Sequence, residues 1–177
     1  MTDSETPFTG SDDYRLGETA GEHALHHRAE TRDAALALAR QARLSLRIFT
    51  PDLEGSLYSN EPFRSAVSKL ARAGRRTFVR ILVQDPSRAV QQDHRLIGLI
   101  QHLPTHIQVR RVGADWADEP YAFQVADEEG VLWRPQAERF EGSVDFYAGP
   151  RARELRKWFD DVWEQSTPDP EFRRLRL

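Results

Sequence analysis

A histidine and an arginine follow the most apolar stretch of the chain, residues 78–83, which is nearly continuous β-branched and apolar sequence. His94 and Arg95 come soon after this stretch, with Asp85 and Asp93 nearby. In open α/β sheets, ligands bind beyond the carboxyl ends of the strands. This position suits His94 as a base or as a phosphate contact beside Arg95. Alternatively, the segment is a plain helix N-terminus, in which Asp93 is the cap and His94 and Arg95 are solvated or paired.

The densest basic part of the sequence offers a second kind of chemistry, the binding of nucleic-acid phosphates. It consists of Arg72, Arg75, Arg76 and Arg80, with Arg110 and Arg111 further along the chain. Such a patch attracts phosphates electrostatically, and its binding weakens steeply as salt rises. Basic residues at a helix end and along an edge strand also serve solubility alone, so both interpretations stay open.

Three histidines near the N-terminus, His23, His26 and His27, raise the question of a metal site. If this segment were helical, His23 and His27 would share one face, as in many zinc helices. The sequence has no glutamate between them and no evident third ligand, so we predict no metal and no other cofactor. Gly-rich phosphate loops, serine elbows and paired-carboxylate spacings are also absent from the sequence.

The composition restricts the classes of protein to which the chain can belong. Its 177 residues suit one domain with a substantial core, and 39% hydrophobic with 30% charged residues is typical of a soluble globular protein. The formal charge of −3 gives no overall attraction to nucleic acid or acidic membranes. The chain has no cysteine, which excludes disulfides and thiolate chemistry. Because neither a signal peptide nor a membrane-spanning run is evident, we expect a cytoplasmic protein with no membrane partner.

Hydrophobic periodicity predicts alternating helices and strands in the first two thirds of the chain. Helices are predicted from a cap at Thr31 to about Arg43, from a cap at Asn60 to a stop at Gly74, and over residues 96–103. Strands are predicted over residues 44–48, 78–83 and 107–112. The order strand, helix, strand is a βαβ unit, and the apolar strand at 78–83 is expected to be buried on both faces.

The last third of the chain predicts a hairpin and one long helix. Residues 122–126 and 131–133 flank an acidic turn, and an acidic, turn-rich loop over residues 113–120 precedes them. A helix is predicted to begin at Pro150. Its apolar stripe, which we interpret as core, consists of Leu155, Trp158, Phe159, Val162 and Trp163.

The order of these elements resembles one half of the phospholipase D fold. Residues 45–52 are similar to the first core strand and its turn, residues 71–83 to the helix end, glycine and second strand, and residues 149–166 to the closing helix. The resemblance implies a mixed β-sheet flanked by helices in a single α/β domain. We expect this domain over residues 18–168, between a flexible tail at 1–17 and a basic tail at 169–177. The chain is also similar to an uncharacterised group of bacterial proteins.

The catalytic motif of that family, His-x-Lys-x-x-x-x-Asp followed by Gly-Ser, is degenerate in this sequence. In the family the histidine attacks phosphorus and the lysine balances the phosphate charge. Matching Asp127 to the aspartate puts Pro120 at the histidine position, Ala122 at the lysine position, and Arg134 and Pro135 at the Gly-Ser pair. No His-x-Lys pair occurs elsewhere in the sequence. The resemblance therefore implies a pseudoenzyme.

Among the residues that replace the catalytic motif, Arg134 is the one whose side chain can bind a phosphate. The resemblance implies that it projects near the former phosphate pocket, where a guanidinium can bind phosphate through two N–H groups. An ordinary salt bridge, with Asp127 or Glu129 as partner, is the alternative interpretation.

The sequence favours a catalytically inactive phospholipase D-like module that binds a phosphate-bearing ligand, including nucleic acid, or a protein partner. The candidate ligand-binding residues are Arg134, His94, Arg95, Asp127, Arg75 and Arg76. One alternative is a phosphodiesterase with a rebuilt site that uses His94. The other is a homodimeric structural or interaction protein, because two halves face each other in the resembled family and one half needs a second copy.

Overall fold

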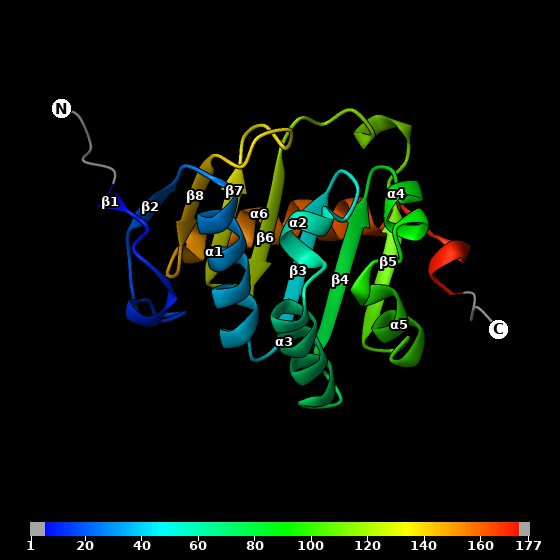
Figure 1. Cartoon of the computed structure of the whole chain (residues 1–177), viewed down its shortest axis with the longest axis horizontal. Coiled ribbons are helices and arrows are strands. Elements are labelled where there is room, and N and C mark those ends of the chain that lie inside the picture. The colour runs from blue at the N-terminus through cyan, green and yellow to red at the C-terminus, as the bar shows by residue number, and fades with distance from the viewer. Residues whose placement is uncertain (1–5, 174–177) are drawn as a thin grey trace.

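The computed structural model of the chain describes residues 6–173, which form a broad sheet with helices on both faces (Figure 1). The helices are α1 (Arg28–Gln41), α2 (Gly55–Tyr58), α3 (Glu61–Arg72), α4 (Ser87–Gln91), α5 (Arg95–His102) and α6 (Gly149–Glu164). Helices α1 to α5 cover the face nearer the viewer in Figure 1, and α6 crosses the far face. No helix within residues 6–173 has both the length and the apolar character needed to cross a bilayer.

The sheet is mixed, as expected. Its strands are β1 (Thr6–Pro7), β2 (Glu22–Leu25), β3 (Ser45–Thr50), β4 (Phe78–Val83), β5 (Ile107–Arg111), β6 (Ala122–Ala126), β7 (Gly130–Arg134), β8 (Gly142–Asp145) and β9 (Thr167–Pro168). Their order in the sheet is β1-β2-β8-β7-β6-β3-β4-β5-β9. Strands β3, β4 and β5 are parallel, whereas β6, β7 and β8 run antiparallel to their neighbours. The parallel strands bring their carboxyl ends to one edge, where ligands bind in folds of this kind.

The two faces of the sheet carry separate hydrophobic cores. Under α1, α3 and α5 the core includes Leu38, Phe63 and Leu99, whereas Phe159 and Trp163 of α6 pack on the other face. Strand β4 lies between both cores, which explains its almost continuous apolar sequence. Its bounds, residues 78–83, are those predicted.

The helix starts agree with the sequence in one case and differ in another. Asn60 caps α3 as predicted, because its side-chain oxygen accepts a hydrogen bond from the Phe63 N–H at 2.9 Å. Helix α1 instead begins at Arg28, with His27 at the N-cap position. Thr31 therefore lies inside the helix, and its hydroxyl donates to the carbonyl oxygen of Phe140 at 2.6 Å. The prediction of a cap at Thr31 was wrong because its hydroxyl, instead of accepting from the first turn of a helix, donates to a carbonyl oxygen far away in the sequence.

Parts of both expected tails are folded. Phe8 and Tyr14 are buried and their rings stack at 5.1 Å, while β1 pairs with β2. At the other end the ring of Phe172 is buried, and β9, just before the expected tail, pairs with β5. Aromatic rings anchor these segments, although the rest of their composition is polar and charged.

Candidate functional sites on opposite edges

The β6–β7 hairpin carries the positions that resemble the phospholipase D motif. Ala122 pairs with Arg134 at one end of the hairpin, and Ala126 pairs with Gly130 at the other. Pro120 and Ala122 thus lie at the carboxyl edge of β3 and β4, together with Arg134, whereas Asp127 lies at the opposite edge. A proline and an alanine supply neither a nucleophile nor a charge there.

Asp127 fastens the hairpin turn to the start of β3. Its carboxylate accepts hydrogen bonds from the backbone N–H groups of Arg43, Leu44 and Ser45, at 3.1, 2.8 and 3.1 Å. The residue is buried and adopts a φ of 55°, in the left-handed region. Asp127 therefore organises the backbone at this turn.

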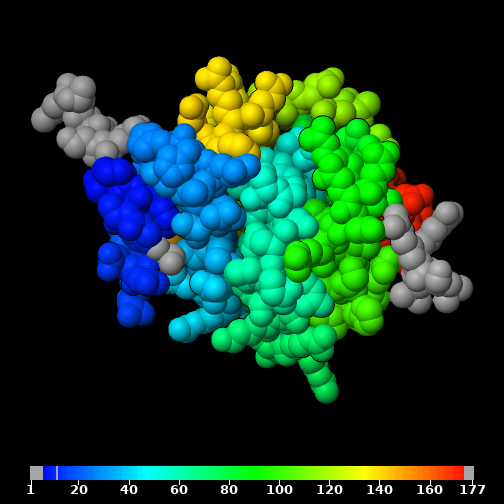
Figure 2. All heavy atoms as spheres, viewed as in Figure 1, coloured from blue at the N-terminus to red at the C-terminus, as the bar shows by residue number. Residues whose placement is uncertain are grey.

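A cavity of about 940 Å³ opens at the carboxyl edge. It is lined by the turn after β3, the residue after β4, helix α4, and two loops within residues 117–120 and 136–140. The segments that line it meet at the upper edge in Figure 2. Pro120, at the former histidine position, is one of the lining residues.

The lining of this cavity is acidic. It contains five carboxylates, those of Asp52, Glu54, Asp118, Glu119 and Glu138. Arg88 is the one cation among the lining residues, and its guanidinium already lies 3.2 Å from the Asp52 carboxylate. Such a surface repels a phosphate group. The cavity thus has the location of a phosphate site without its electrostatics.

The guanidinium of Arg134 is bound by other groups of the protein. Its guanidinium forms an ion pair with Glu54, and Nη1 donates to the carbonyl oxygens of Ala137 and Arg139 at 3.0 and 3.1 Å. The side chain is 1% exposed. The expected salt bridge therefore exists, but with Glu54 rather than Asp127 or Glu129. Burial raises the pKa of Glu54, and the neighbouring Arg134 opposes that rise.

His94 and Arg95 occupy the start of α5. His94 is the N-cap, and its Nδ1 accepts a hydrogen bond from the Leu96 N–H at 3.1 Å, so Asp93 is not the cap. Burial lowers the pKa of His94 to about 4, while a contact with the Leu53 backbone opposes the shift. The exposed Arg95 guanidinium lies 3.7 Å from Glu61. Neither residue lines the cavity.

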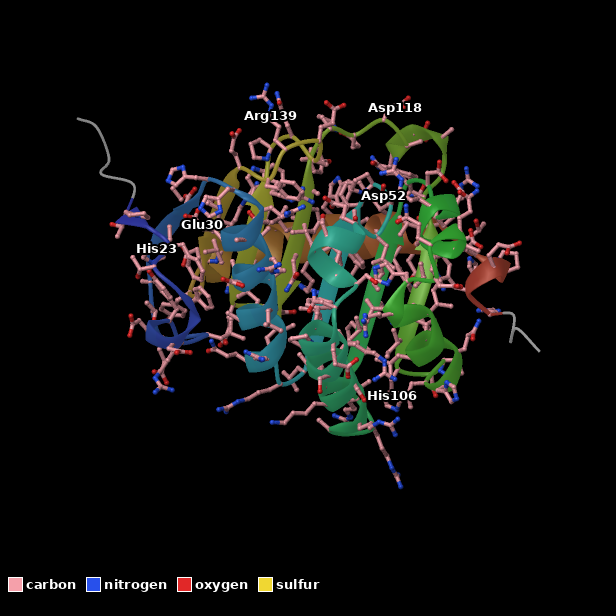
Figure 3. All side chains as sticks on the ribbon, in the orientation of Figure 1. His23, Glu30, Asp52, His106, Asp118 and Arg139 are labelled. Carbon is pink, nitrogen blue, oxygen red and sulfur yellow. The ribbon has the colours of Figure 1, made fainter. Side chains whose placement is uncertain are left out.

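A basic edge lies at the opposite ends of the strands. The carboxyl-terminal ends of α1 and α3 meet there, and the Phe78 N–H donates to the Leu44 carbonyl oxygen at 3.2 Å. Six exposed cationic side chains lie in the last turns of these helices or just after them, namely Arg40, Arg43, Lys69, Arg72, Arg75 and Arg76. Among the described residues, no carboxylate oxygen lies within 4.0 Å of the charged side-chain group of any of the six. Figure 3 shows the two edges apart, with Asp52 and Asp118 at one and His106 at the other.

Residues 27–175 match the family described as Domain of unknown function (DUF7931). The chain belongs to the DUF7931 family. No curated protein matches its sequence.

The DUF7931 chain shares its fold with solved structures of low sequence identity. TrmBL2, described as an archaeal chromatin protein with a novel mode of DNA binding, has a TM-score of 0.64 at 11% identity; 91% of this chain and 56% of TrmBL2 are covered. NucT from Helicobacter pylori has a TM-score of 0.61 at 14% identity, over 84% of this chain and 99% of NucT. Nuc from Salmonella typhimurium, a phospholipase D family member, has a TM-score of 0.55 at 15% identity, with 84% and 99% covered. The fold is phospholipase D-like, and the DUF7931 chain spans little more than half of TrmBL2.

The structure also separates residues that the sequence had grouped. In the DUF7931 chain His23 lies on β2 and His27 precedes α1, so the two do not share a helical face. No cluster of metal-ligating side chains occurs within residues 6–173. Sequence reasoning found Arg72, Arg75 and Arg76 but missed Arg40, Arg43 and Lys69. The signal was present, because both predicted helices end in basic residues, and their packing side by side joins the two groups.

Proposed function

We propose that the DUF7931 chain is a non-catalytic phospholipase D-like module that binds nucleic-acid phosphates with its basic edge. The observation that carries the proposal is the set of six exposed cations on this edge, none with a carboxylate partner within the described residues. Surface cations that serve only solubility are interspersed with carboxylates. A cluster of cations without carboxylate partners is the electrostatic pattern of a protein surface that binds nucleic acid.

The acidic cavity also supports this proposal, because its carboxylates repel phosphate and leave the basic edge as the place where phosphate can bind. Pro120 and Ala122 offer no chemistry at the family's catalytic positions, and Arg134 is held by Glu54. His94 does not favour the alternative of a rebuilt phosphodiesterase, because it is buried beneath α5 with Nδ1 engaged by Leu96. Binding at the edge opposite the cavity needs none of these residues.

The test is a fluorescence-anisotropy titration with labelled single-stranded and duplex DNA at 50 and 200 mM salt. If all six cations contact phosphates, the affinity for duplex falls about 10³-fold between the two salt concentrations. The variant Arg75→Ala/Arg76→Ala is expected to bind at least about tenfold more weakly at 50 mM salt, with a salt slope reduced by about two.

The matched control is Arg151→Ala/Arg153→Ala, which removes two exposed cations from α6, away from the basic edge. We expect its affinity to stay within about twofold of the wild type. Absence of binding by the wild-type chain at 50 mM salt would overturn the proposal. So would equal losses in the edge variant and the control.

A further inference from the structure

Part of the α6 face of the sheet is polar and basic rather than apolar. On β3, β4 and β5 the side chains that point to this face alternate along each strand. Near the carboxyl ends they are Phe49 and Leu82, which α6 covers. Towards the basic edge they are Arg47, Phe78, Arg80 and Gln108, while Arg110 lies further along β5, level with Leu82. We call these five residues the arginine shelf.

The three arginines of the shelf lie beside one another with aromatic rings between them. Arg47 pairs with Arg80 across β3 and β4. The Phe78 ring has the Arg47 guanidinium at 5.0 Å and that of Arg80 at 4.6 Å. The Trp163 ring has Arg80 at 5.3 Å and Arg110 at 4.5 Å. Cation–π contacts hold the guanidiniums in place without neutralising them.

The charges of the shelf are only partly compensated. Arg47 is buried and forms a two-point ion pair with Asp160, at 2.9 and 3.2 Å. Arg110 donates to the Trp163 carbonyl oxygen at 2.7 Å. Arg80 is half-buried, and within residues 6–173 no carboxylate lies within 4.0 Å of it. Burial lowers the pKa of Arg80; Asp160 opposes this, and the charges of Arg47 and Arg110 add to it.

A fixed group of like charges of this kind is stabilised by an added anion. The shelf adjoins the basic edge, because Arg76 lies in the turn that leads into β4, two positions before Phe78 and four before Arg80. We propose that a single nucleic-acid strand bound at the basic edge continues onto the arginine shelf, where Arg80 and Arg110 contact its phosphates. This inference rests on the proposed function and names the form of nucleic acid preferred.

The position of the shelf selects a single strand over a duplex. The basic edge projects into solvent, so the phosphates of either form reach it. The shelf lies around a corner, on the face of the sheet beside the end of α6. Duplex DNA is stiff over about 150 base pairs and does not follow such a corner without a cost in bending energy. A flexible strand follows it, and positively charged surfaces that track the phosphate backbone are the usual sites for single strands.

The experiment compares Arg80→Gln and Arg80→Ala with the wild type in anisotropy titrations against a single-stranded oligonucleotide and its duplex. We expect single-strand affinity to fall about five- to tenfold and duplex affinity to stay within about twofold. The single-strand salt slope should shrink by about 0.7, the value for one lost phosphate contact. Arg111→Ala is the matched control, since Arg111 is exposed and alternates to the other face of β5.

Thermal unfolding of each variant confirms that it is folded before its affinity is compared. Unchanged single-strand affinity in both Arg80 variants would overturn the inference. An equal loss for single strand and duplex would also overturn it. The proposed function is separable from this result, because loss of both nucleic acids in Arg75→Ala/Arg76→Ala, with no effect at Arg80, leaves the basic edge as the site and removes only the shelf.

Discussion

Arg134 and Glu54, eighty positions apart in the chain, form a buried ion pair beneath the wall of the acidic cavity. The pair joins the end of β7 to the turn after β3. Arg134 also donates to two carbonyl oxygens of the loop that follows β7, so one side chain orders three segments.

Removing the cation of this pair should destabilise the fold. In Arg134→Met the Glu54 carboxylate stays buried without its partner, and we expect the free energy of unfolding to fall by about 3–5 kcal/mol. Urea unfolding at pH 7.5 measures the loss. The double variant Glu54→Gln/Arg134→Met should recover part of it. A loss below about 1 kcal/mol would show that the pair is not buried as described.

The same variant should respond to pH. Because burial already raises the pKa of Glu54, this carboxyl favours folding below its unfolded pKa, and that contribution is lost as pH rises through its folded pKa. Without Arg134 the pKa rises further. The deficit of Arg134→Met relative to the wild type should therefore be smaller at pH 4.5 than at pH 7.5, and a constant deficit would contradict this.

His94 should make the fold sensitive to acid. Its folded pKa of about 4 lies below the ordinary value of 6.5, so its contribution to stability is present above pH 6.5 and is lost as pH falls towards 4. Between pH 7.5 and 5.0 this amounts to about 2 kcal/mol.

The variant His94→Asn isolates this contribution. Asparagine keeps a side-chain oxygen to accept from the Leu96 N–H and is a good helix cap. The difference in free energy of unfolding between wild type and variant should shrink by about 2 kcal/mol from pH 7.5 to 5.0. Parallel pH profiles for the two proteins would refute the assignment.

Much of the fold was predictable because its strongest elements are local. Residues 78–83, the hairpin around Asp127 and the stripe of α6 each follow from hydrophobic spacing within a few turns or residues. Strands β2 and β8 were missed, since each has four residues and at least half of them polar or glycine. Their pairing places Glu22 opposite Asp145, residues that no local pattern connects.

The candidate sites were less predictable than the fold. Arg75 and Arg76 were found as a run together with Arg80 and Arg110, but Arg47 was missed, although it alternates with apolar residues in a predicted strand. The partner of Arg134 could not be deduced, because the acidic residues near it in sequence are separated from it by the length of the hairpin. Both the arginine shelf and the partner of Arg134 depend on contacts between residues that are far apart in the sequence.

Asp127 should be needed for stability rather than for binding. Asp127→Ala leaves the N–H groups of Arg43, Leu44 and Ser45 without their acceptor and puts alanine at a φ of 55°. We expect a loss of about 2–4 kcal/mol in unfolding free energy. Asp127→Asn keeps an oxygen and tolerates this backbone, so its loss should be less than half as large; equal losses would contradict the hydrogen-bond account.

Two glycines should respond oppositely to alanine. A Cβ on Gly142 would collide with the Trp133 carbonyl oxygen and approach Arg134 Cγ at 3.0 Å, so Gly142→Ala should cost more than about 2 kcal/mol. Gly98 occupies an exposed position on α5 with nothing within 4 Å of its missing Cβ, and Gly98→Ala should stabilise the protein by about 0.5–1 kcal/mol. Thermal unfolding compares the two, and a stabilising Gly142→Ala would mean that β7 and β8 are not in this close contact.

Five carboxylates line the cavity at one edge and six exposed cations lie at the other, although the net charge is only −3. Far from a polyanion the net charge repels weakly, and salt screens it beyond about 8–10 Å. Nearer, the field of the polyanion exerts a torque that turns the ends of α1 and α3 inward and the carboxylates outward. On the proposed function, encounters with nucleic acid would thus be orientated before any contact forms. A surface covered by many copies would present an acidic outer layer, which opposes the stacking of a second layer of the same chain.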